Sequence, residues 1–421
     1  MQVDTIVHSA QQLLSLTPQA QRGRNLGELR VLQDAGLAIR EGRIVQVGPT
    51  GDVLREYSAD HHIDAEGLVI LPGFVDPHTH AMWIGDRTDE FQRRIAGEGY
   101  SQILAAGGGI LSTVRRTREA SVDQLVDSTL PRLQQMLAHG TTTCELKTGY
   151  GLELEAEWRM LEAVSRLRKL VPMTLVATFL PAHAIPAEFA SRPEDYVREI
   201  VEEILPEAMR RWRSLPGNQE PLFADVFCEP GAFNLSQARR ILESAGQLGY
   251  LLKIHADEFQ TLHAVQLAVE LGAVSADHVV ATPRADIQAL GGSSTVAVSL
   301  PGTSFGLGER SFSPAHRLLE ANALLALGSD LNPGTSPCES MQMILAIACR
   351  YLHLTPAQAI AASTINGAAA VRREAQLGSL TPGKQADLVA FQIPSYLHLG
   401  YRYGTNLVKW VLQRGRVVYS G

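Results

Sequence analysis

Eight short apolar runs, most of them separated by segments of helical periodicity, limit the folds open to this 421-residue chain. Strands buried on both faces appear as nearly continuous apolar runs, and their alternation with helices over about 250 to 300 residues is typical of a (β/α)8 barrel. We therefore predict an α/β fold with a (β/α)8 TIM barrel. A doubly wound sheet is the alternative, although no G-x-G-x-x-G follows the first run. The runs centre near residues 75, 143, 177, 226, 253, 276, 297 and 326.

The two ends of the chain have a different, strand-rich pattern. Residues 36–48 alternate on both sides of Glu41-Gly42 and predict a hairpin. Residues 378–391 and 406–419 alternate in a similar way. We predict that the two ends pack together as one small β-sandwich domain, with separate attachment to the barrel as the alternative. The predicted ranges are 1–71 and 377–421 for the β-sandwich domain and 72–376 for the barrel.

Composition and charge exclude several classes of function. A net charge of −7 and a pI near 6.0 give no electrostatic footprint for nucleic acid. No apolar run approaches the ~18 residues of a membrane span, and the start lacks the basic and apolar regions of a signal peptide. The 4 cysteines are scattered singly, which favours reduced thiols. We expect a soluble, cytoplasmic protein.

The first run ends in the string Gly73–His80, which contains two histidines in an H-x-H pattern. Side chains alternate between the two faces of a strand, so His78 and His80 point the same way. Two neutral imidazoles on one face can bind one zinc or iron ion. Two solvated loop histidines are the alternative, because H-x-H alone is a weak signal. The long stretch 81–121 that follows, with glycines at 107–109, predicts a functional loop.

Further polar residues follow the other apolar runs, at the carboxyl ends of strands where barrel active sites are built. A mononuclear metal site needs three or four protein ligands and an open position for water, whose pKa the ion lowers to about 7. Three imidazoles and one carboxylate supply such a set. The candidate ligands are His78, His80, His255 and Asp330, and the other strand-end histidines are His183 and His278.

Proton transfer at this site requires a further group. Glu258 follows the candidate ligand His255 in the string His255-Ala256-Asp257-Glu258, and its carboxylate can face a bound substrate. The alternative is a solvated acid at the start of the next helix, where the helix dipole favours negative charge. Asp257 fits that alternative better than Glu258 does.

These residues, with β segments at both ends, resemble the amidohydrolase superfamily of barrel metal hydrolases. In its binuclear members a lysine at the end of strand four bridges two metals. Here that position is Cys228-Glu229, and Lys147 lies at the end of strand two, so the resemblance implies a single ion. Longer strings resemble the imidazolonepropionase family, and this resemblance spans nearly the whole chain. The strings are residues 76–80, 85–87, 145–151, 181–186, 253–258 and 329–335.

The resemblance implies hydrolysis of 4-imidazolone-5-propanoate to N-formimidoyl-L-glutamate, the ring-opening step of histidine degradation. It also implies one Zn2+ or Fe3+ ion per subunit and a homodimer. The implied catalytic residues are Asp330 for the water's proton, His278 for orienting water or polarising the carbonyl, and Glu258 for the leaving ring nitrogen. The implied substrate-binding residues are Arg87, Tyr150, His183, Glu258, Asn332, Gly334 and Thr335.

Arg87 is the residue that points to an acidic substrate. A buried propionate needs a cationic or multi-donor partner, and an arginine can bind a carboxylate through two hydrogen bonds. A surface ion pair of Arg87 with Asp86 or Asp89 is the alternative. Two rival functions also stay open. One is a mononuclear deaminase of a pyrimidine or related heterocycle, which needs no such arginine. The other is a catalytically inactive barrel with a structural role, which needs no intact ligand set.

Overall fold

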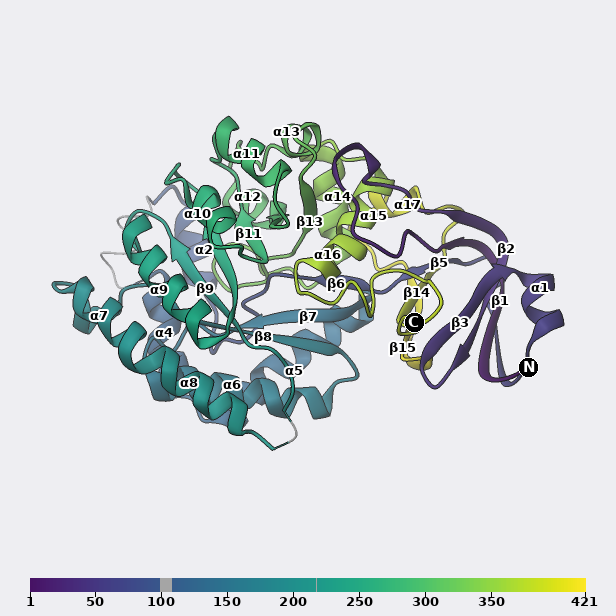
Figure 1. Cartoon of the computed structure of the whole chain (residues 1–421), viewed down its shortest axis with the longest axis horizontal. Coiled ribbons are helices and arrows are strands. Elements are labelled where there is room, and N and C mark those ends of the chain that lie inside the picture. Colours follow the sequence, from purple (N-terminus) through teal and green to yellow (C-terminus); the bar gives the residue numbers. More distant parts are fainter. Residues whose placement is uncertain (99–107, 217) are drawn as a thin grey trace.

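A computed structural model describes residues 1–98, 108–216 and 218–421, with a barrel as one lobe and a smaller β sheet as the other (Figure 1). Eight parallel barrel strands pair in sequence order, and nearly all of their residues are buried. This confirms the α/β fold and the barrel that the apolar runs predict. The strands are β6 (Phe74–Asp76), β7 (Thr141–Lys147), β8 (Thr174–Ala182), β9 (Phe223–Cys228), β10 (Leu251–Ala256), β11 (Ser275–His278), β12 (Val296–Ser299) and β13 (Leu324–Leu327).

Helices connect these strands and surround the barrel (Figure 1). α5 begins at a capping box on Ser121 and continues through Pro131. Residues 193–214 are divided into α7, a π-helical turn (Ile200–Ile204) and α8, because Pro206 lacks the N–H of a regular helix. The helices from α4 on are α4 (Ile110–Arg118), α5 (Val122–Ala138), α6 (Leu154–Leu170), α7 (Pro193–Glu199), α8 (Leu205–Ser214), α9 (Leu235–Leu248), α10 (Ala264–Glu270), α11 (Arg284–Gly291), α12 (Pro301–Leu307), α13 (Ala315–Glu320), α14 (Met341–Tyr351), α15 (Pro356–Ala362), α16 (Ile365–Ala369) and α17 (His398–Tyr401).

The connection between β6 and β7 is not the single long loop that the sequence predicts. It contains α2 (Thr88–Ile95) and α4, which are joined by a segment that lies partly outside the described residues. Gly107 belongs to that undescribed segment, whereas Gly109 precedes the first turn of α4. No residue of α2 is buried, and most of its side chains are charged or polar. The helix therefore has no apolar face from which the sequence could predict it.

The barrel closes between its first and last strands. Thr79, just after β6, forms an isolated parallel bridge with Leu331, just after β13. The amide of Asp330 donates to the carbonyl of His78 at 3.0 Å. Below this bridge the buried Asp76 carboxylate accepts hydrogen bonds from the Ser329 amide at 3.0 Å and hydroxyl at 2.5 Å. Closure therefore brings the H-x-H string and Asp330 together, although they lie at opposite ends of the barrel sequence.

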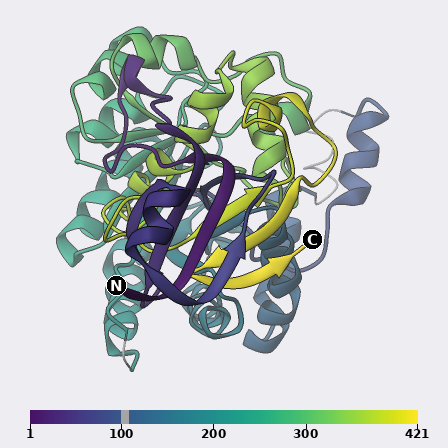
Figure 2. The same ribbon diagram turned by 90° about the vertical axis from the view of Figure 1, so that its right-hand side faces the viewer.

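The second lobe is built from both ends of the chain, and the C-terminal strands lie beside the N-terminal ones (Figure 2). β5 joins the two ends because it pairs in parallel with β1 and antiparallel with β14. The hairpin predicted at residues 36–48 is confirmed as part of β2 and β3. The sheet runs β16-β15-β14-β5-β1-β2-β3, with β4 also paired to β1. Its strands, with the helix α1 (Thr50–Glu56), are β1 (Gln2–Leu14), β2 (Val31–Arg40), β3 (Arg43–Pro49), β4 (Ser58–Asp64), β5 (Val69–Pro72), β14 (Leu388–Phe391), β15 (Val408–Gln413) and β16 (Arg416–Ser420).

The division of the chain at residues 72 and 377 stays a prediction. Within the first range, Leu16, Leu26 and Leu29 belong to the large apolar core that also fills the barrel lobe. The backbone of Arg22 also bridges to Leu324 of β13. This N-terminal segment therefore contacts the barrel, although the predicted range assigns it to the other lobe.

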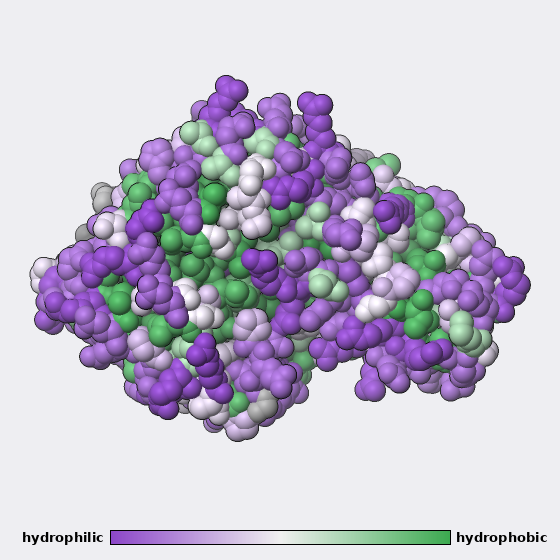
Figure 3. All heavy atoms as spheres, in the orientation of Figure 1, coloured by the Kyte–Doolittle hydropathy of each residue, from purple (hydrophilic) through white to green (hydrophobic). Residues whose placement is uncertain are grey.

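A cleft of about 1110 Å³ lies between the two lobes, lined by residues such as Arg168 and Thr174 of the barrel and His61 and Arg416 of the β sheet. None of the predicted site residues, all of which the structure describes, lines this cleft. The face drawn in Figure 3 is mainly hydrophilic, with apolar side chains in small groups among the polar ones. Among the described helices, none combines the length and the apolar character needed to cross a bilayer.

Candidate metal centre and active site

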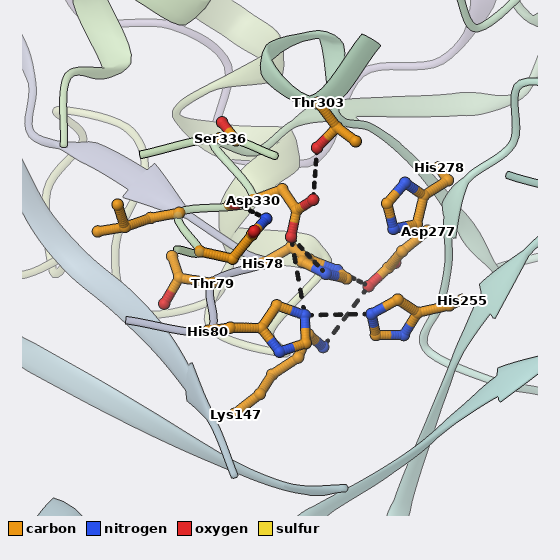
Figure 4. A network of polar contacts seen from close by, with 12 residues as sticks. His78, Thr79, His80, Lys147, His255, Asp277, His278, Thr303, Asp330 and Ser336 are labelled. Atoms are coloured by element: carbon orange, nitrogen blue, oxygen red, sulfur yellow. Dashed lines mark hydrogen bonds and ion pairs between the residues drawn. The ribbon is translucent and has the colours of Figure 1, made fainter. Parts of the chain in front are cut away.

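The predicted metal ligands meet at the carboxyl ends of the barrel strands (Figure 4). His80 Nε2 lies 3.2 Å from His255 Nε2 and 3.7 Å from Asp330 Oδ1, and His78 Nε2 lies 3.5 Å from the same oxygen. Two overlapping groups of ligand atoms each lie within 4.8 Å of one another. The groups are His78, His80 and His255, and His78, His278 and Asp330.

The protonation states of these side chains suit a metal ion. Burial, followed by the nearby cationic groups, lowers the pKa values of His78, His80 and His278 well below the usual value, so their imidazoles are neutral. His78 Nε2 is buried and has no hydrogen-bond partner among the described residues. Burial raises the pKa of Asp330 to about 6, which is expected of a carboxylate whose counter-charge is a bound cation. The residues present therefore fit a single metal ion.

Several residues just after the strands adopt an unusual backbone conformation. His278, Asp330 and Asp257 have φ values of 74°, 51° and 50°, in the left-handed region that non-glycine residues rarely enter. Such strain costs about 1–3 kcal/mol per residue and persists where surrounding contacts enforce it. At Asp330 those contacts are a hydrogen bond from the Thr303 hydroxyl to Oδ2 and one from Asn332 Nδ2 to the carbonyl at 2.7 Å. Oδ1 is thereby left to face the histidines.

Beneath the candidate ligands lies a buried network of three carboxylates and two lysines. Asp277 Oδ2 lies 2.6 Å from His78 Nδ1, and Asp225 Oδ2 lies 3.0 Å from His255 Nδ1. The Asp277 carboxylate is hydrogen-bonded to His78 Nδ1, whereas the Asp225 carboxylate lies at ion-pair distance from His255 Nδ1. A carboxylate beside Nδ1 favours a proton on that nitrogen and leaves Nε2 of the same ring for the metal position. Although burial opposes it, His255 and then Lys147 hold the pKa of Asp225 well below its usual range. The network thus fixes the tautomers of two ligands.

The two lysines balance the charge of these carboxylates. Lys147 Nζ lies 2.7 Å from Asp225 Oδ2 and 3.0 Å from Glu145 Oε2. Lys253 Nζ lies 3.0 Å from Glu145 Oε1 and 3.4 Å from Asp277 Oδ2. All of these side chains are fully buried. Loss of one partner would leave an uncompensated buried charge, which costs about 3–5 kcal/mol.

We therefore expect the Lys147→Met substitution to lower the free energy of unfolding of the metal-free protein by about 3–5 kcal/mol. Urea unfolding followed by circular dichroism measures this change. The control is Lys169→Met, because Lys169 is exposed near the end of α6 and its replacement should shift stability by no more than about 0.5 kcal/mol. Equal stability of the two variants would show that Lys147 does not balance the carboxylates.

The predicted proton-transfer residue Glu258 lies beside His278. Glu258 Oε2 is 3.5 Å from His278 Nε2, and the Glu258 side chain is 9% exposed. Burial, followed by the negative charges of Asp330 and Glu229, raises the pKa of Glu258 well above its usual value. The structure therefore brings Glu258 beside His278 and Asp330, in surroundings that favour the protonated form of its carboxyl group.

Two of the predicted substrate-binding residues, His183 and Tyr150, lie beside His80. The rings of His80 and His183 stack at 4.6 Å, and the Tyr150 ring centroid lies 6.0 Å from that of His80. His183 Nδ1 is 2.9 Å from the Gly149 carbonyl, and burial followed by His255 lowers its pKa to about 3, so this ring is neutral. Tyr150 is 3% exposed and therefore buried, although glycines flank it on both sides in the sequence.

Arg87 pairs with a different acid from the two that the sequence suggests. Its guanidinium donates to Glu90 Oε2 at 2.8 and 2.6 Å, whereas Asp86 accepts from Thr88. The guanidinium also lies over Gly334, where an added Cβ would come within 2.2 Å of it. Arg87 therefore contacts the loop that follows β13 at Gly334, four residues after Asp330.

That loop is held by the side chain of Asn332. Its Oδ1 accepts from the amides of Gly334 and Thr335, each at 2.8 Å, and its Nδ2 donates to the Asp330 carbonyl and, at 2.9 Å, to Thr335 Oγ1. The three predicted residues are thus brought together beside Asp330. The Asn332 amide, however, directs its groups into its own loop.

The sequence interpretation missed the network and Thr303. A signal for part of it exists, because Asp225 and Lys253 are charged residues within apolar strand runs, and Lys253 lies two positions from His255 on the same face. Which of these charged residues contact one another depends on how the barrel closes. The local sequence pattern around each residue does not give that information. The missed residues are Glu145, Asp225, Lys253, Asp277 and Thr303.

Comparison with known proteins defines the class. The model of the amidohydrolase family matches residues 69–410. Guanine deaminase from E. coli has a TM-score of 0.74 at 17% identity, covering 99% of both chains. An adenosine deaminase from Xanthomonas campestris with bound zinc has a TM-score of 0.71 at 21% identity, covering 99% of this chain and 93% of that one. The chain is thus an amidohydrolase, with a candidate metal site at the position where the barrel closes.

Sequence relatives narrow this class further. The imidazolonepropionase of Herpetosiphon aurantiacus is 53% identical, covering 95% of this chain and 94% of the relative. The imidazolonepropionase of Chloroflexus aggregans is 47% identical, covering 99% of each. The chain belongs to the imidazolonepropionase family.

Proposed function

We propose that this chain hydrolyses the cyclic amide bond of 4-imidazolone-5-propanoate to give N-formimidoyl-L-glutamate, with one metal ion at the site. The observation that carries the proposal is the meeting of buried imidazoles, the Asp330 carboxylate and the Glu258 carboxyl group at one end of the barrel. The relatives named imidazolonepropionase support the choice of substrate.

The reaction needs an activated water and an acid for the leaving nitrogen. A bound ion supplies a Lewis acid and a water of pKa about 7. Asp330 Oδ1 accepts the proton that the attacking water loses, while Thr303 holds Oδ2. His278 hydrogen-bonds the substrate carbonyl or the water. Glu258 donates its proton to the ring nitrogen as the carbon–nitrogen bond breaks, so the formimidoyl nitrogen leaves as part of a neutral amidine group. The proposed metal ligands are His78, His80, His255 and Asp330.

The substrate propionate is proposed to bind Arg87, with Tyr150 and His183 as further donors and with Asn332, Gly334 and Thr335 forming the adjoining loop. In this arrangement the propionate replaces Glu90 as the partner of the guanidinium, which already forms two hydrogen bonds to one carboxylate oxygen. A deaminase acting on an uncharged ring would gain nothing from this arginine.

The Arg87→Met variant tests the propionate assignment. A hydrogen bond between charged groups contributes about 1.5–3 kcal/mol, so we expect kcat/KM to fall about 10- to 150-fold, mainly through KM. The matched control is Arg93→Met on α2, the helix that follows Arg87, because Arg93 forms an outward-facing ion pair with Glu98 at 2.6 Å. An unchanged KM in the Arg87 variant would remove Arg87 from the substrate site.

The reaction itself is tested with purified protein and 4-imidazolone-5-propanoate. We expect loss of ring absorbance without release of ammonia, abolished by a chelator and restored by added Zn2+ or Fe3+. Release of ammonia from a pyrimidine would favour a deaminase instead. A preparation that binds neither metal would favour the inactive barrel.

Three further assignments stay predictions. They are the identity of the ion as zinc or iron, the homodimer, and the cytoplasmic location. Elemental analysis of protein purified without added metal tests the first. Light scattering coupled to size-exclusion chromatography tests the second, and fractionation of the source cells tests the third.

A further inference from the structure

The segment that carries Glu258 has no regular secondary structure of its own. Residues 257–260 follow β10 as a series of bends before α10 begins. Its two ends are tied to the same residue, because the Ala281 amide donates to the Asp257 carbonyl at 2.7 Å and the Thr261 hydroxyl donates to the Ala281 carbonyl. Between these ties the backbone of Glu258 needs another anchor, because a displacement there moves the carboxyl group.

That anchor is the side chain of Glu229, which comes from a neighbouring strand. Glu229 follows β9, the strand paired with β10, and is 2% exposed. Its Oε1 accepts from the amide of Glu258 at 2.5 Å and from the amide of Phe259 at 3.2 Å. A carboxylate that accepts two backbone N–H groups forms strong, charge-assisted bonds. No other hydrogen bond holds these two amides within the described residues.

We propose that Glu229 is a positioning residue for the reaction, which holds the backbone of Glu258 so that its carboxyl group stays beside His278. The side chain of Glu229 does not transfer a proton in this role. Its effect on catalysis rests on the proposed function, whereas its effect on the segment 257–261 does not. Glu229 follows β9, the fourth barrel strand, whose end has no metal-bridging lysine in this chain. The end of this strand instead supports Glu258, the proposed proton-transfer residue.

Three substitutions separate the effect of the length of the Glu229 side chain from the effect of its charge. Glu229→Gln keeps an oxygen at the same distance but removes the charge. Glu229→Asp keeps the charge but withdraws the oxygen by one methylene group, and Glu229→Ala removes both. We expect Gln to keep kcat within about tenfold of wild type, and Asp and Ala to lose about 10²-fold, because misplacement of a catalytic group by about 1 Å costs that much. Glu243→Ala, an exposed acid on α9, is the control and should leave kcat unchanged.

Hydrogen exchange of the backbone amides gives a readout that needs neither substrate nor metal. We expect the peptide containing Glu258 and Phe259 to exchange at the wild-type rate in Glu229→Gln and clearly faster in Glu229→Asp and Glu229→Ala. If this pattern appears without any turnover of 4-imidazolone-5-propanoate, the proposed function fails and the positioning role stands. An active Asp variant beside an inactive Gln variant, or unchanged exchange in the Asp and Gln variants, overturns the proposal even if the Ala variant does not fold.

Discussion

The Asp330→Ala variant is expected to lose most of its bound metal and to hydrolyse 4-imidazolone-5-propanoate at least about 10³-fold more slowly. Asp330 is the only carboxylate in the proposed ligand set, and its loss leaves three neutral imidazoles around a cation. The same substitution removes the proposed acceptor for the water's proton, and such a group contributes about 10²–10⁴-fold. Elemental analysis measures the first effect, and steady-state kinetics the second.

Two companion variants give this prediction its controls. Thr303→Val leaves the ligand in place but removes the hydrogen bond to Asp330 Oδ2, so we expect metal affinity to fall about 10–100-fold, less than in Asp330→Ala. His278→Asn should keep its metal and lose activity. Because His278 also groups with His78 and Asp330, a metal-free His278→Asn protein would move this histidine into the ligand set. Full metal content in Asp330→Ala would contradict the proposed set.

Most of the site could be predicted because its residues occupy one repeated position in the fold. His255 is the next-to-last residue of β10, and His278 is the last residue of β11. At these positions the buried apolar strands end and polar residues follow. The β-branched and apolar runs define those strand ends locally, so the sequence contains their positions. The register of a barrel then places all such ends on one rim.

The supporting residues could not be predicted, since their partners are distant in sequence. Lys147 appeared only as a lysine in the wrong place for a metal bridge, whereas the structure makes it the counter-charge of Asp225 and Glu145. In the sequence, Glu229 is notable only because it lies where the binuclear relatives have the metal-bridging lysine. In the structure, its carboxylate accepts hydrogen bonds from two backbone amides of the loop that follows β10. Both roles follow from the pairing of neighbouring strands and from barrel closure.

The Glu258→Gln variant is expected to bind metal normally but to lower kcat by about 10²–10⁴-fold, with a smaller change in KM. Glutamine has nearly the same shape, so the side chain should remain buried beside His278, but it has no acidic proton to give the leaving nitrogen. Burial, then Asp330 and Glu229, raise the pKa of Glu258, which favours the protonated form that can donate the proton. Its activity should therefore fall as the pH rises through that raised pKa.

A full pH profile of both proteins provides the decisive comparison. The basic limb present in the wild-type profile should be missing from that of Glu258→Gln, because an amide does not titrate. Glu229→Gln is the matched neighbour, since it also replaces a buried acid but retains the proton of Glu258, and it should stay within about tenfold of wild type. If Glu258→Gln retained kcat within the same factor, the proton for the ring nitrogen would have to come from another group, and His278, whose Nε2 lies 3.5 Å from Glu258 Oε2, would be the first candidate.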